Sequence, residues 1–369
     1  MSRVVHLTSA HPRDDIRIFL KECRSLSAHG HEVFLVVADG RGNEVLNGVK
    51  IVDFGLPIGR IDRMLKVTQR VFVKAVELDA DIYHLHDPEL LPIGLKLKRL
   101  GKKVVFDAHE DVPKQILGKH YIHPWVRRIL SWGFCHFERY ACSRFDGVVT
   151  ATPYIRDKFL KINHRSIDIN NFPMVGELES SVTWREKAKE VCYVGSIAQV
   201  RGVNELVLAM ESTRTAVRLN LVGGFSEQHV ESKVRGYKGW ENVNYLGVQD
   251  RLGVREVMSR SIAGLVTLHP IPNYLDALPI KMFEYMSAGI PVIASSFDLW
   301  QSIIEEANCG LCVDPLDPLS VADAIDYLVD HPNEARQMGE NGRRAVLSRY
   351  NWAQEEKKLL SFYDEIFSQ

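Results

Sequence analysis

The chain has 369 residues, of which 46% are hydrophobic and 25% charged, and a formal net charge of −1. This length suits two domains, and the apolar content suits ordered cores in place of intrinsic disorder. No segment reaches about 18 consecutive apolar residues, so the sequence predicts no membrane-spanning helix. The first residues, MSRVVHLTSAHP, have the pattern of a first strand and not of a secretion signal.

Short β-branched runs alternate with longer amphipathic stretches along the whole chain. We expect strands at Val4–Thr8, Val33–Ala38, Val49–Phe54, Ile82–His86, Val104–Asp107, Gly147–Thr150, Val191–Val194, Leu219–Val222, Val243–Leu246, Ala263–Thr267, Val292–Ala294 and Cys312–Val313. Strands that alternate with helices indicate parallel, doubly wound sheets, and two such sets predict an α/β protein with two Rossmann-like domains. Turn residues between Asn170 and Glu190 place the boundary, which gives domains over residues 1–172 and 173–350 and a C-terminal helix over 351–369.

Polar side chains follow the predicted strands of the first half. Ligands of doubly wound sheets bind beyond the carboxyl ends of the strands, so we expect the active site in the cleft between the two domains. His86 and Asp87 end one strand, and His109 follows another beside Asp107, where they suit the hydroxyls of a ligand. The segment after the first strand has no glycine, and its side chains predict either ligand recognition or an ion-paired turn: Arg13, Asp15 and Arg17.

The first half of the chain is basic. Residues 1–170 contain 27 Lys and Arg against 20 Asp and Glu, whereas residues 171–369 contain 19 against 27. At 100° per residue, one helical arc of about 120° collects the basic side chains Arg60, Arg63, Lys66, Arg70 and Lys74. A second basic and aromatic stretch covers residues 114–139. No nucleic-acid-binding signature is present, so contact with an anionic membrane surface is the expected role, with a solvated face as the alternative.

A glycine and an arginine mark the first strand of the second half. Gly195 and Ser196 follow this strand directly, and Arg201 precedes the next helix. A glycine lets the backbone approach a ligand, and a guanidinium grips a phosphate with two parallel hydrogen bonds. We therefore expect a diphosphate near Gly195 and Arg201, although a solvated arginine at a helix start is the plainer interpretation of Arg201.

The segment DALPIKMFEYMSAGIPVIAS, residues 276–295, predicts a helix over Ile280–Ala288 and then a buried strand. Pro279 suits the first turn of this helix, and the free N–H groups near Ala277 and Leu278 suit an anion. Lys281 opposes the dipole in this first turn, and a bound anion would resolve that conflict.

Two carboxylates flank the same helix start. Glu284 lies among Phe283, Tyr285 and Met286, where burial of a charge requires a hydroxyl or a cation as its partner. Asp276 lies in the loop before the helix, where a carboxylate also acts as a plain stabiliser of the dipole.

These motifs resemble the retaining glycosyltransferases of family 4, which have the GT-B architecture: two Rossmann-like domains that face a cleft, with a last helix that crosses back to the first domain. The resemblance implies that Glu284 binds the ribose of a sugar nucleotide and that Asp276, one methylene shorter than the family's glutamate, contacts the transferred sugar. It also implies that Arg201 and Lys281 stabilise the diphosphate and that His109 positions the sugar. Ser196 stands where the family usually has an arginine.

The predicted reaction is therefore metal-independent transfer of a hexosyl unit, with retention, from a UDP-sugar and without a cofactor. We expect an N-acetylhexosamine as the sugar. The expected acceptor is a polyprenyl-diphosphate-linked saccharide in O-antigen-like bacterial lipopolysaccharide synthesis, at the inner face of the cytoplasmic membrane, with no nucleic acid as partner. The expected donor-binding residues are Gly195, Ser196, Arg201, Ala277, Leu278, Pro279, Ile280, Lys281 and Glu284. The expected acceptor-binding residues are Arg13, Asp15, Arg17, His86 and Asp87. A non-hydrolysing UDP-sugar epimerase and a non-catalytic sugar-nucleotide-binding protein remain open as alternatives.

Overall fold

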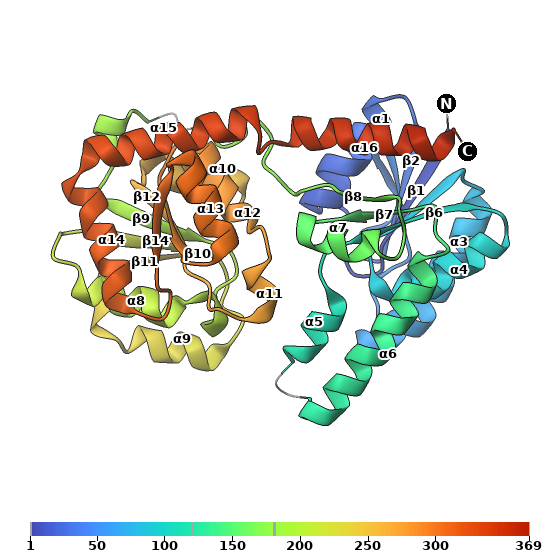
Figure 1. The fold of residues 1–369 in the computed structure, drawn as a ribbon, viewed down its shortest axis with the longest axis horizontal. Helices are drawn as coiled ribbons and strands as arrows, with labels where there is room; N and C mark the ends of the chain where they lie inside the picture. The colour runs from blue at the N-terminus through green and yellow to red at the C-terminus, as the bar shows by residue number, and fades with distance from the viewer. Residues whose placement is uncertain (1, 120–121, 180–181, 369) are drawn as a thin grey trace. The chain divides into compact units, whose positions relative to one another are not determined.

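The computed structural model describes residues 2–119, 122–179 and 182–368, with the side chains of residues 60, 61, 64 and 65 left out. The chain forms two compact units (Figure 1). The first unit combines Met1–Asn171 with Gln354–Gln369, and the second is Phe172–Ala353. Each unit contains one largely parallel sheet with helices on both faces, which confirms the prediction of an α/β protein with two Rossmann-like sheets.

The sheet of the first unit has the strand order β3-β4-β2-β1-β5-β6-β7-β8 in the part of the chain described. Its strands are β1 (Arg3–Leu7), β2 (Glu32–Val37), β3 (Glu44–Leu46), β4 (Val49–Asp53), β5 (Ile82–Leu85), β6 (Lys103–Ala108), β7 (Gly147–Thr150) and β8 (Ser166–Asp168). Only the β3–β4 pair among these is antiparallel. The order reverses between β1 and β5, so the carboxyl ends of these two strands form the switch point at which such sheets bind ligands.

The two faces of this sheet differ in chemistry because successive side chains point to opposite sides. Val5, Leu7, Tyr83, Leu85 and Phe106 belong to an apolar core with helices α3, α4, α6 and α7. The opposite face bears buried histidines and is covered by η1 and α16. The helical segments of this unit are η1 (Ile16–Cys23), α1 (Arg24–Ala28), α2 (Gly59–Asp62), η2 (Arg63–Val67), α3 (Thr68–Leu78), η3 (Pro88–Leu90), α4 (Leu91–Arg99), α5 (Val112–Leu117), α6 (Pro124–Cys142), α7 (Pro153–Leu160) and α16 (Trp352–Phe367), of which η1 and η2 are π-helical and η3 is a 3₁₀ turn.

The last helix, α16, packs on the sheet of the first unit. Tyr363 lies 2.8 Å from Nδ1 of His84 through its hydroxyl, and Lys103 donates to the carbonyl oxygen of Ile366 at 2.7 Å. Gly147 in β7 leaves room for the ring of Phe362, which a Cβ at that position would overlap. Apolar contact and charge-assisted hydrogen bonds thus hold the C-terminal segment on this sheet.

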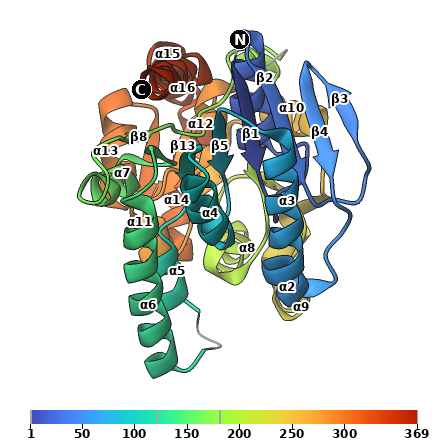
Figure 2. The same ribbon diagram turned by 90° about the vertical axis from the view of Figure 1, so that its right-hand side faces the viewer.

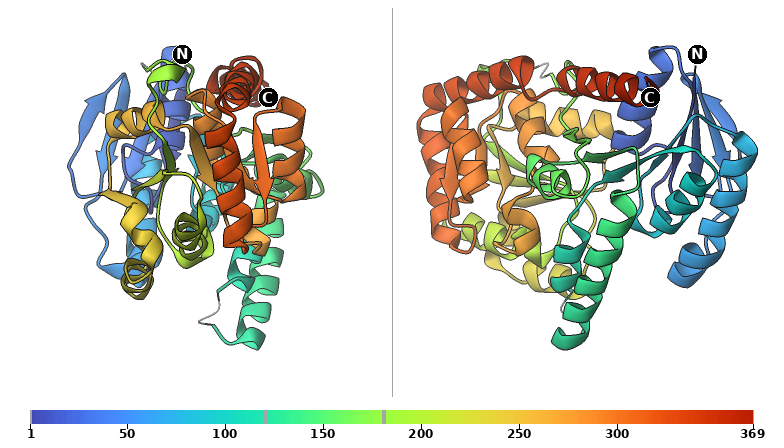
Figure 3. Two further views of the ribbon diagram at one scale, coloured as in Figure 1. Left: turned by 90° about the vertical axis from the view of Figure 1, so that its left-hand side faces the viewer. Right: turned by 45° about the vertical axis from the view of Figure 1, so that its right-hand side comes forward.

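Helices α5 and α6 form a hairpin that stands out from the sheet of the first unit (Figure 2). Most of α6 projects beyond the strands, as the turned view in the right half of Figure 3 also shows. The projecting part carries the exposed rings of Trp125 and Trp132. In the described part of the chain, no helix is both long and apolar enough to cross a bilayer.

The sheet of the second unit is parallel, with the strand order β11-β10-β9-β12-β13-β14. Its strands are β9 (Glu190–Val194), β10 (Arg218–Val222), β11 (Val243–Gly247), β12 (Ala263–Val266), β13 (Val292–Ser295) and β14 (Gly310–Val313). The order reverses between β9 and β12, which places the switch point at the ends of these strands. The helical segments are η4 (Trp184–Glu186), η5 (Gln199–Arg201), α8 (Val203–Ser212), α9 (Gln228–Arg235), η6 (Lys238–Asn242), α10 (Arg251–Arg260), α11 (Pro272–Leu275), α12 (Ile280–Ser287), α13 (Asp298–Ala307), α14 (Pro318–Asp330) and α15 (Pro332–Ser348).

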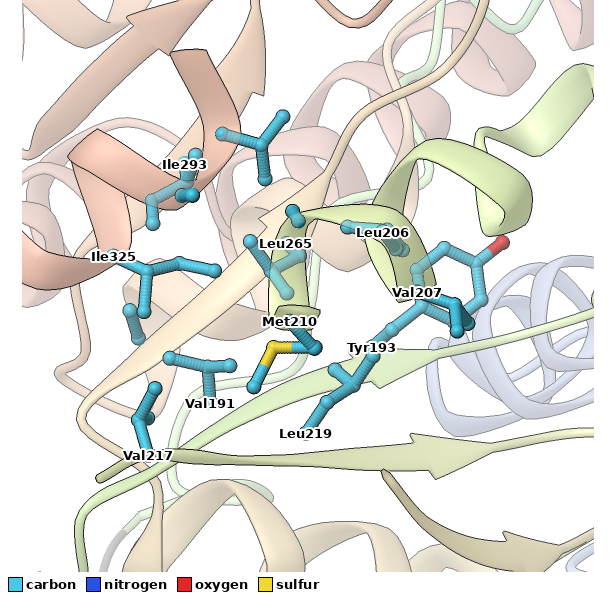
Figure 4. Close-up of a cluster of buried hydrophobic side chains, with 14 of the residues drawn as sticks. Val191, Tyr193, Leu206, Val207, Met210, Val217, Leu219, Leu265, Ile293 and Ile325 are labelled. Atoms are coloured by element: carbon cyan, nitrogen blue, oxygen red, sulfur yellow. The ribbon is translucent and has the colours of Figure 1, made fainter. Parts of the chain in front are cut away.

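Figure 4 shows the core on one face of this sheet, where side chains of strands β9, β10, β12 and β13 meet helices α8 and α14. Leu206 and Met210 come from α8 and Ile325 from α14, and all three are buried. A second apolar cluster on the other face includes Met282 and Phe283 of α12. Because both faces are covered, the strands are continuous apolar runs, as expected for a parallel sheet.

All predicted strands are present, with ends within about two residues of the expected positions, as is usual for strand ends. The sequence did not predict the edge strands β3 and β8. Each is three residues long and lacks a run of β-branched residues. Pro279 is the N-cap of α12 with ψ of 121°, and not its first helical residue, so the helix begins at Ile280.

Candidate active site

A glycine, a lysine and an arginine meet at the switch point of the second unit. Gly195 follows β9 with φ of +127°, a conformation that favours glycine. A Cβ at this position would lie 3.1 Å from Nζ of Lys281 and 3.9 Å from Nη1 of Arg201. The structure therefore brings together three residues that the sequence assigns to the diphosphate.

Lys281 is a buried lysine whose Nζ atom lacks a hydrogen-bond partner among the described residues. The residue is only 8% exposed, and within residues 2–119, 122–179 and 182–368 its Nζ atom has no hydrogen-bond partner. Burial, followed by repulsion from Arg201, lowers the pKa of Lys281 well below its ordinary value. The ring of Tyr193, with its centroid 3.6 Å from Nζ, offers partial compensation. An anion next to Lys281 would supply the missing partner.

Arg201 reaches this site through an unusual backbone contact. It ends η5, and Gly202 follows with φ of +78°. A Cβ at Gly202 would overlap with the carbonyl oxygen of Thr267, so glycine allows the start of α8 to lie against the end of β12.

Burial raises the pKa of Tyr193 to about 12, although the guanidinium of Arg201 opposes the rise.

Ser196 lies in the turn after β9 and is exposed. Its hydroxyl is 2.7 Å from the hydroxyl of Ser226, which follows β10. The loops after β9 and β10 also touch through their backbones, since a Cβ at Gly223 would overlap with the carbonyl oxygen of Gly195. Ser196 is thus part of the rim of the switch point, at the place where the family pattern has a cation.

Glu284 has a cation as its partner, as its apolar neighbourhood requires. One carboxylate oxygen lies 2.7 Å from Nη1 of Arg251, and Nε of Arg251 lies 2.8 Å from Glu177. Burial opposes the charge of Arg251, but the two carboxylates, Glu177 first, raise its pKa above the ordinary value. Glu284 is 7% exposed and lies in the second turn of α12. The ion pair fixes the orientation of the carboxylate whose predicted partner is a ribose hydroxyl.

The segment before α12 makes contacts within its own loop. Asp276 ends α11 and is half-buried. The N–H of Ala277 donates to the carbonyl oxygen of Tyr274 at 3.2 Å, and its carbonyl oxygen accepts from Nε1 of Trp300 at 2.7 Å. Leu278, Pro279 and Ile280 continue into the helix start and are half-buried. The N–H of Ala277 is therefore already hydrogen-bonded to Tyr274, whereas the sequence predicted that this N–H is free for an anion.

Three residues at the end of β12 and the start of α8 belong to the same neighbourhood and were not predicted. Nε2 of His269 lies 3.0 Å from Oε2 of Glu205, in the first turn of α8. The hydroxyl of Thr267 is buried and, among the residues that the structure describes, has no hydrogen-bond partner. His269 lies two residues after a predicted strand, which is the signal that the sequence offered for it.

In the first unit, two of the predicted acceptor-binding residues are engaged in internal ion pairs. Arg13 is buried and pairs with Asp39 at 2.7 Å and Glu44 at 2.9 Å. Arg17 is buried and pairs with Asp107 at 2.7 Å, while Nη1 donates to the carbonyl oxygen of Ile169 at 2.6 Å. These contacts favour the ion-paired turn over recognition of a ligand by Arg13 and Arg17.

The other predicted acceptor residues also have internal partners. Asp15 caps η1 by accepting from the N–H groups of Arg17 and Ile18. Burial opposes the charge of Asp15, but a hydrogen bond from His11 and the N–H of Ile18 lower its pKa to about 2. Asp87 is buried and accepts from the hydroxyl of Thr8 at 2.9 Å. Nδ1 of His86 lies 3.3 Å from Asp107.

His109 lies beside Asp107 and is partly exposed. Its Nε2 atom lies 2.8 Å from Oδ2 of Asp107, and 21% of its side chain is exposed. Burial opposes the charge of Asp107, but Arg17 and then His109 hold its pKa well below the ordinary value. A buried carboxylate therefore orients the imidazole of His109 at the end of β6.

The basic arc on α2, η2 and α3 is partly neutralised. Arg63 pairs with Glu89 at 2.9 Å and Lys74 with Glu77 at 2.9 Å, while Arg70 donates to the carbonyl oxygen of Phe54 at 3.3 Å. The side chain of Arg60 lies outside the described part of the chain. In the 114–139 region, of which residues 120–121 are likewise outside, the side chains of Trp125 and Trp132 are 65% and 68% exposed.

Comparison with known proteins gives a family for each half of the chain. Residues 17–169 match the model described as Glycosyltransferase Family 4, and residues 176–345 match the model described as Glycosyl transferases group 1. The phosphatidyl-myo-inositol mannosyltransferase of Mycobacterium leprae is 23% identical over 321 residues, which cover 84% of this chain and 80% of that protein.

Solved structures show the same fold. Sucrose-phosphate synthase from Thermosynechococcus elongatus is similar with a TM-score of 0.81 at 19% identity, over 100% of both chains. Anabaena HepE, solved in complex with UDP and glucose, has a TM-score of 0.76 at 14% identity and covers 99% of this chain and 100% of its own. The two halves of the chain are thus a glycosyltransferase family 4 domain followed by a glycosyl transferases group 1 domain, and the protein is a glycosyltransferase with the GT-B fold.

Proposed function

We propose that this glycosyltransferase moves a hexosyl unit from a UDP-sugar, with retention at the anomeric carbon and without a metal ion in the transfer. The observation that carries the proposal is the buried ammonium of Lys281 beside Gly195 and Arg201. Two cations at the switch point suit a leaving diphosphate, on which negative charge develops as the bond to the sugar breaks. The complex of Anabaena HepE with UDP and glucose supports a UDP-sugar as donor.

The carboxylate of Glu284, oriented by Arg251, is proposed to bind the ribose hydroxyls of the donor. Asp276 in the loop before α12 is proposed to contact the sugar. His109, oriented by Asp107, is proposed to position the sugar from the first unit. No side chain is assigned as a nucleophile, so retention is proposed to follow attack of the acceptor hydroxyl on the face from which the diphosphate leaves.

Transfer is tested with the purified chain, a panel of four donors (UDP-Glc, UDP-Gal, UDP-GlcNAc and UDP-GalNAc), and polyprenyl-diphosphate-linked saccharides as acceptors. We expect UDP release only when an acceptor is present. The proton NMR spectrum of the product should show an axial glycosidic bond, as the bond from the sugar to UDP is axial in the donor. The rate should be highest with an N-acetylhexosamine donor. Arg201→Gln should lower the rate at least tenfold, whereas the exposed Lys233→Gln in α9 should not. Epimerised donor in the absence of acceptor would refute transfer as the function.

We propose further that the acceptor is lipid-linked, as in O-antigen assembly on the inner face of the bacterial cytoplasmic membrane. The name of the Mycobacterium leprae relative includes a phospholipid acceptor, which supports this choice. The exposed face of the α5–α6 hairpin supports contact with the bilayer, since Trp125, Ile129 and Trp132 are exposed next to Arg128. Tryptophan and arginine together suit the interface of an anionic membrane.

Membrane contact is tested by flotation with vesicles of phosphatidylglycerol and phosphatidylcholine. We expect the chain to float with the anionic vesicles, and the double variant Trp125→Ser/Trp132→Ser to stay in the soluble fraction. Leu252→Ser, which removes an exposed apolar side chain from the second unit, serves as the matched control. Equal flotation of all three proteins would show that the hairpin is not the contact.

A further inference from the structure

Three histidines and a glutamate meet in the interior of the first unit. His6 lies in β1, His84 in β5 and His86 directly after β5, while Glu22 comes from η1. His6 and His84 are partners across the β1–β5 ladder, and His86 is two residues further along the same face. Each of the four offers one ligand atom, and these atoms lie within 4.8 Å of one another. We refer to these four residues as the histidine–glutamate cluster.

The cluster is buried, and several of its polar atoms lack partners. Within the described ranges, neither carboxylate oxygen of Glu22 has a hydrogen bond, and the same holds for Nε2 of His6 and of His84. All three side chains are fully buried at 0% exposure. Arg17 approaches Glu22 to 3.2 Å, but its guanidinium already donates to both oxygens of Asp107 and to Ile169. Buried polar groups are normally satisfied, so these atoms are available to a ligand.

In two of these imidazoles, Nδ1 has a partner that holds the ring in place. Nδ1 of His86 lies 3.3 Å from the carboxylate of Asp107, and Nδ1 of His84 lies 2.8 Å from the hydroxyl of Tyr363. Contacts of this kind set the tautomer and the ring direction of metal-binding histidines. They leave Nε2 of His84 without a hydrogen-bond partner among the described residues. Nε2 of His86 lies 2.8 Å from Nδ1 of His6, which in turn lies 3.9 Å from Oε2 of Glu22, so an ion bound there would replace the hydrogen bond between the two rings.

We propose that His6, Glu22, His84 and His86 bind one divalent transition-metal ion of the zinc type, which joins β1, β5 and η1. Three imidazoles and one carboxylate are ligands that zinc accepts in four-coordinate sites, whereas calcium and magnesium prefer oxygen ligands throughout. Zinc ligands lie about 2.0–2.2 Å from the ion, so the four side chains draw together by small rotations when it binds. The ion lies in the first unit and is structural. The expectation that the transfer needs no metal concerns a different role, the stabilisation of the diphosphate.

The first test measures the metal content of the full-length chain without an affinity tag, purified without chelators from cells grown with added zinc. Mass spectrometry of the metal should find one zinc ion per chain. His84→Gln and Glu22→Gln should each reduce the content at least tenfold. His229→Gln changes an exposed histidine of the second unit and should leave the content unchanged. Wild-type protein without metal, or full metal content in both cluster variants, would overturn the proposal.

A second measurement uses the wild-type chain, because a variant in the interior of a sheet can fail to fold. Metal is removed with dipicolinate, and Zn²⁺ or Co²⁺ is added back. Zn²⁺ should raise the midpoint of thermal unfolding, and Co²⁺ should produce the visible absorption bands of a four-coordinate site. The protein with His109→Gln, outside the cluster, should keep both responses. A thermal midpoint that is unchanged by Zn²⁺, together with Co²⁺ spectra of the free ion, would overturn the assignment.

Discussion

Replacement of Lys281 by methionine should stabilise the ligand-free protein and weaken its binding of UDP. Methionine keeps the length and apolar character of the side chain but removes the ammonium, which is buried and has no hydrogen-bond partner in the described part of the chain. A single substitution is then expected to change stability and affinity in opposite directions. This pattern distinguishes a ligand-binding cation from a structural one, whose loss would lower stability.

The magnitudes follow from the contacts of Nζ. An unsatisfied buried donor costs about 1–3 kcal/mol, and the stacking on Tyr193 offsets about 0.5–2 kcal/mol of that cost. We therefore expect Lys281→Met to raise the free energy of unfolding by about 1 kcal/mol. A charge-assisted hydrogen bond to the diphosphate is worth about 1.5–3 kcal/mol, so the Kd for UDP should rise about 10- to 150-fold.

Both quantities can be measured on the same samples. Chemical denaturation gives the free energy of unfolding, and isothermal titration calorimetry gives the Kd for UDP. Lys233→Met changes an exposed lysine of the same unit and should leave both values near those of the wild type. A variant that binds UDP with wild-type affinity would refute the role of Lys281 at the diphosphate. Loss of stability in the ligand-free state would refute the claim that its ammonium lacks a partner.

Three further predictions concern the same unit. Burial lowers the pKa of Lys281, and a bound diphosphate would raise it, so UDP binding should take up a proton and weaken as pH rises. Calorimetry in buffers of different ionisation enthalpy should show this proton uptake, and Lys281→Arg should abolish it. Glu284→Gln should weaken UDP-sugar binding about 10- to 150-fold by calorimetry, because a ribose hydroxyl then loses a charged hydrogen-bond acceptor. Glu256→Gln, on the exposed face of α10, should have no effect. Unchanged affinity of the Glu284→Gln variant would count against ribose binding by Glu284. Gly202→Ala places a Cβ against the carbonyl oxygen of Thr267 at φ of +78° and should lower the free energy of unfolding, measured in urea, by at least about 1 kcal/mol. Gly224→Ala, where a Cβ meets its nearest atom at 3.5 Å, should change this free energy by less. Equal effects of the two substitutions would contradict the close approach of Gly202 to Thr267.

The sheets could be predicted from sequence because their central strands are apolar and β-branched. Val191–Val194 and Val33–Ala38 are runs of this kind, and each lies in the interior of a covered sheet. The edge strands β3 and β8 have only three residues each and no such signal, whereas the longer edge strands β11 and β14 were predicted. Hydrophobic patterning reports burial, and it reports edge pairing only weakly.

The meeting of Gly195, Arg201 and Lys281 could also be predicted, because each lies at the carboxyl end of a strand or at the start of the next helix. What the sequence could not show was pairing between distant segments. Arg17 pairs with Asp107, 90 residues away, and Arg251 pairs with Glu284, 33 residues away. An arginine after a strand looks the same in sequence whether it binds a ligand or a buried carboxylate, so the burial of Arg13 and Arg17 came only from the structure.

The glycines around the proposed donor site also limit how this enzyme could change its substrate. At Gly202 and Gly223 any side chain would overlap with a carbonyl oxygen of a neighbouring strand end, so neither position can acquire a new contact to the donor without moving backbone. Variation in sugar preference must then come from positions whose side chains already face outward, such as Ser196 and Ser226. A library for altered donor choice in this chain is best built there, with the glycines kept unchanged.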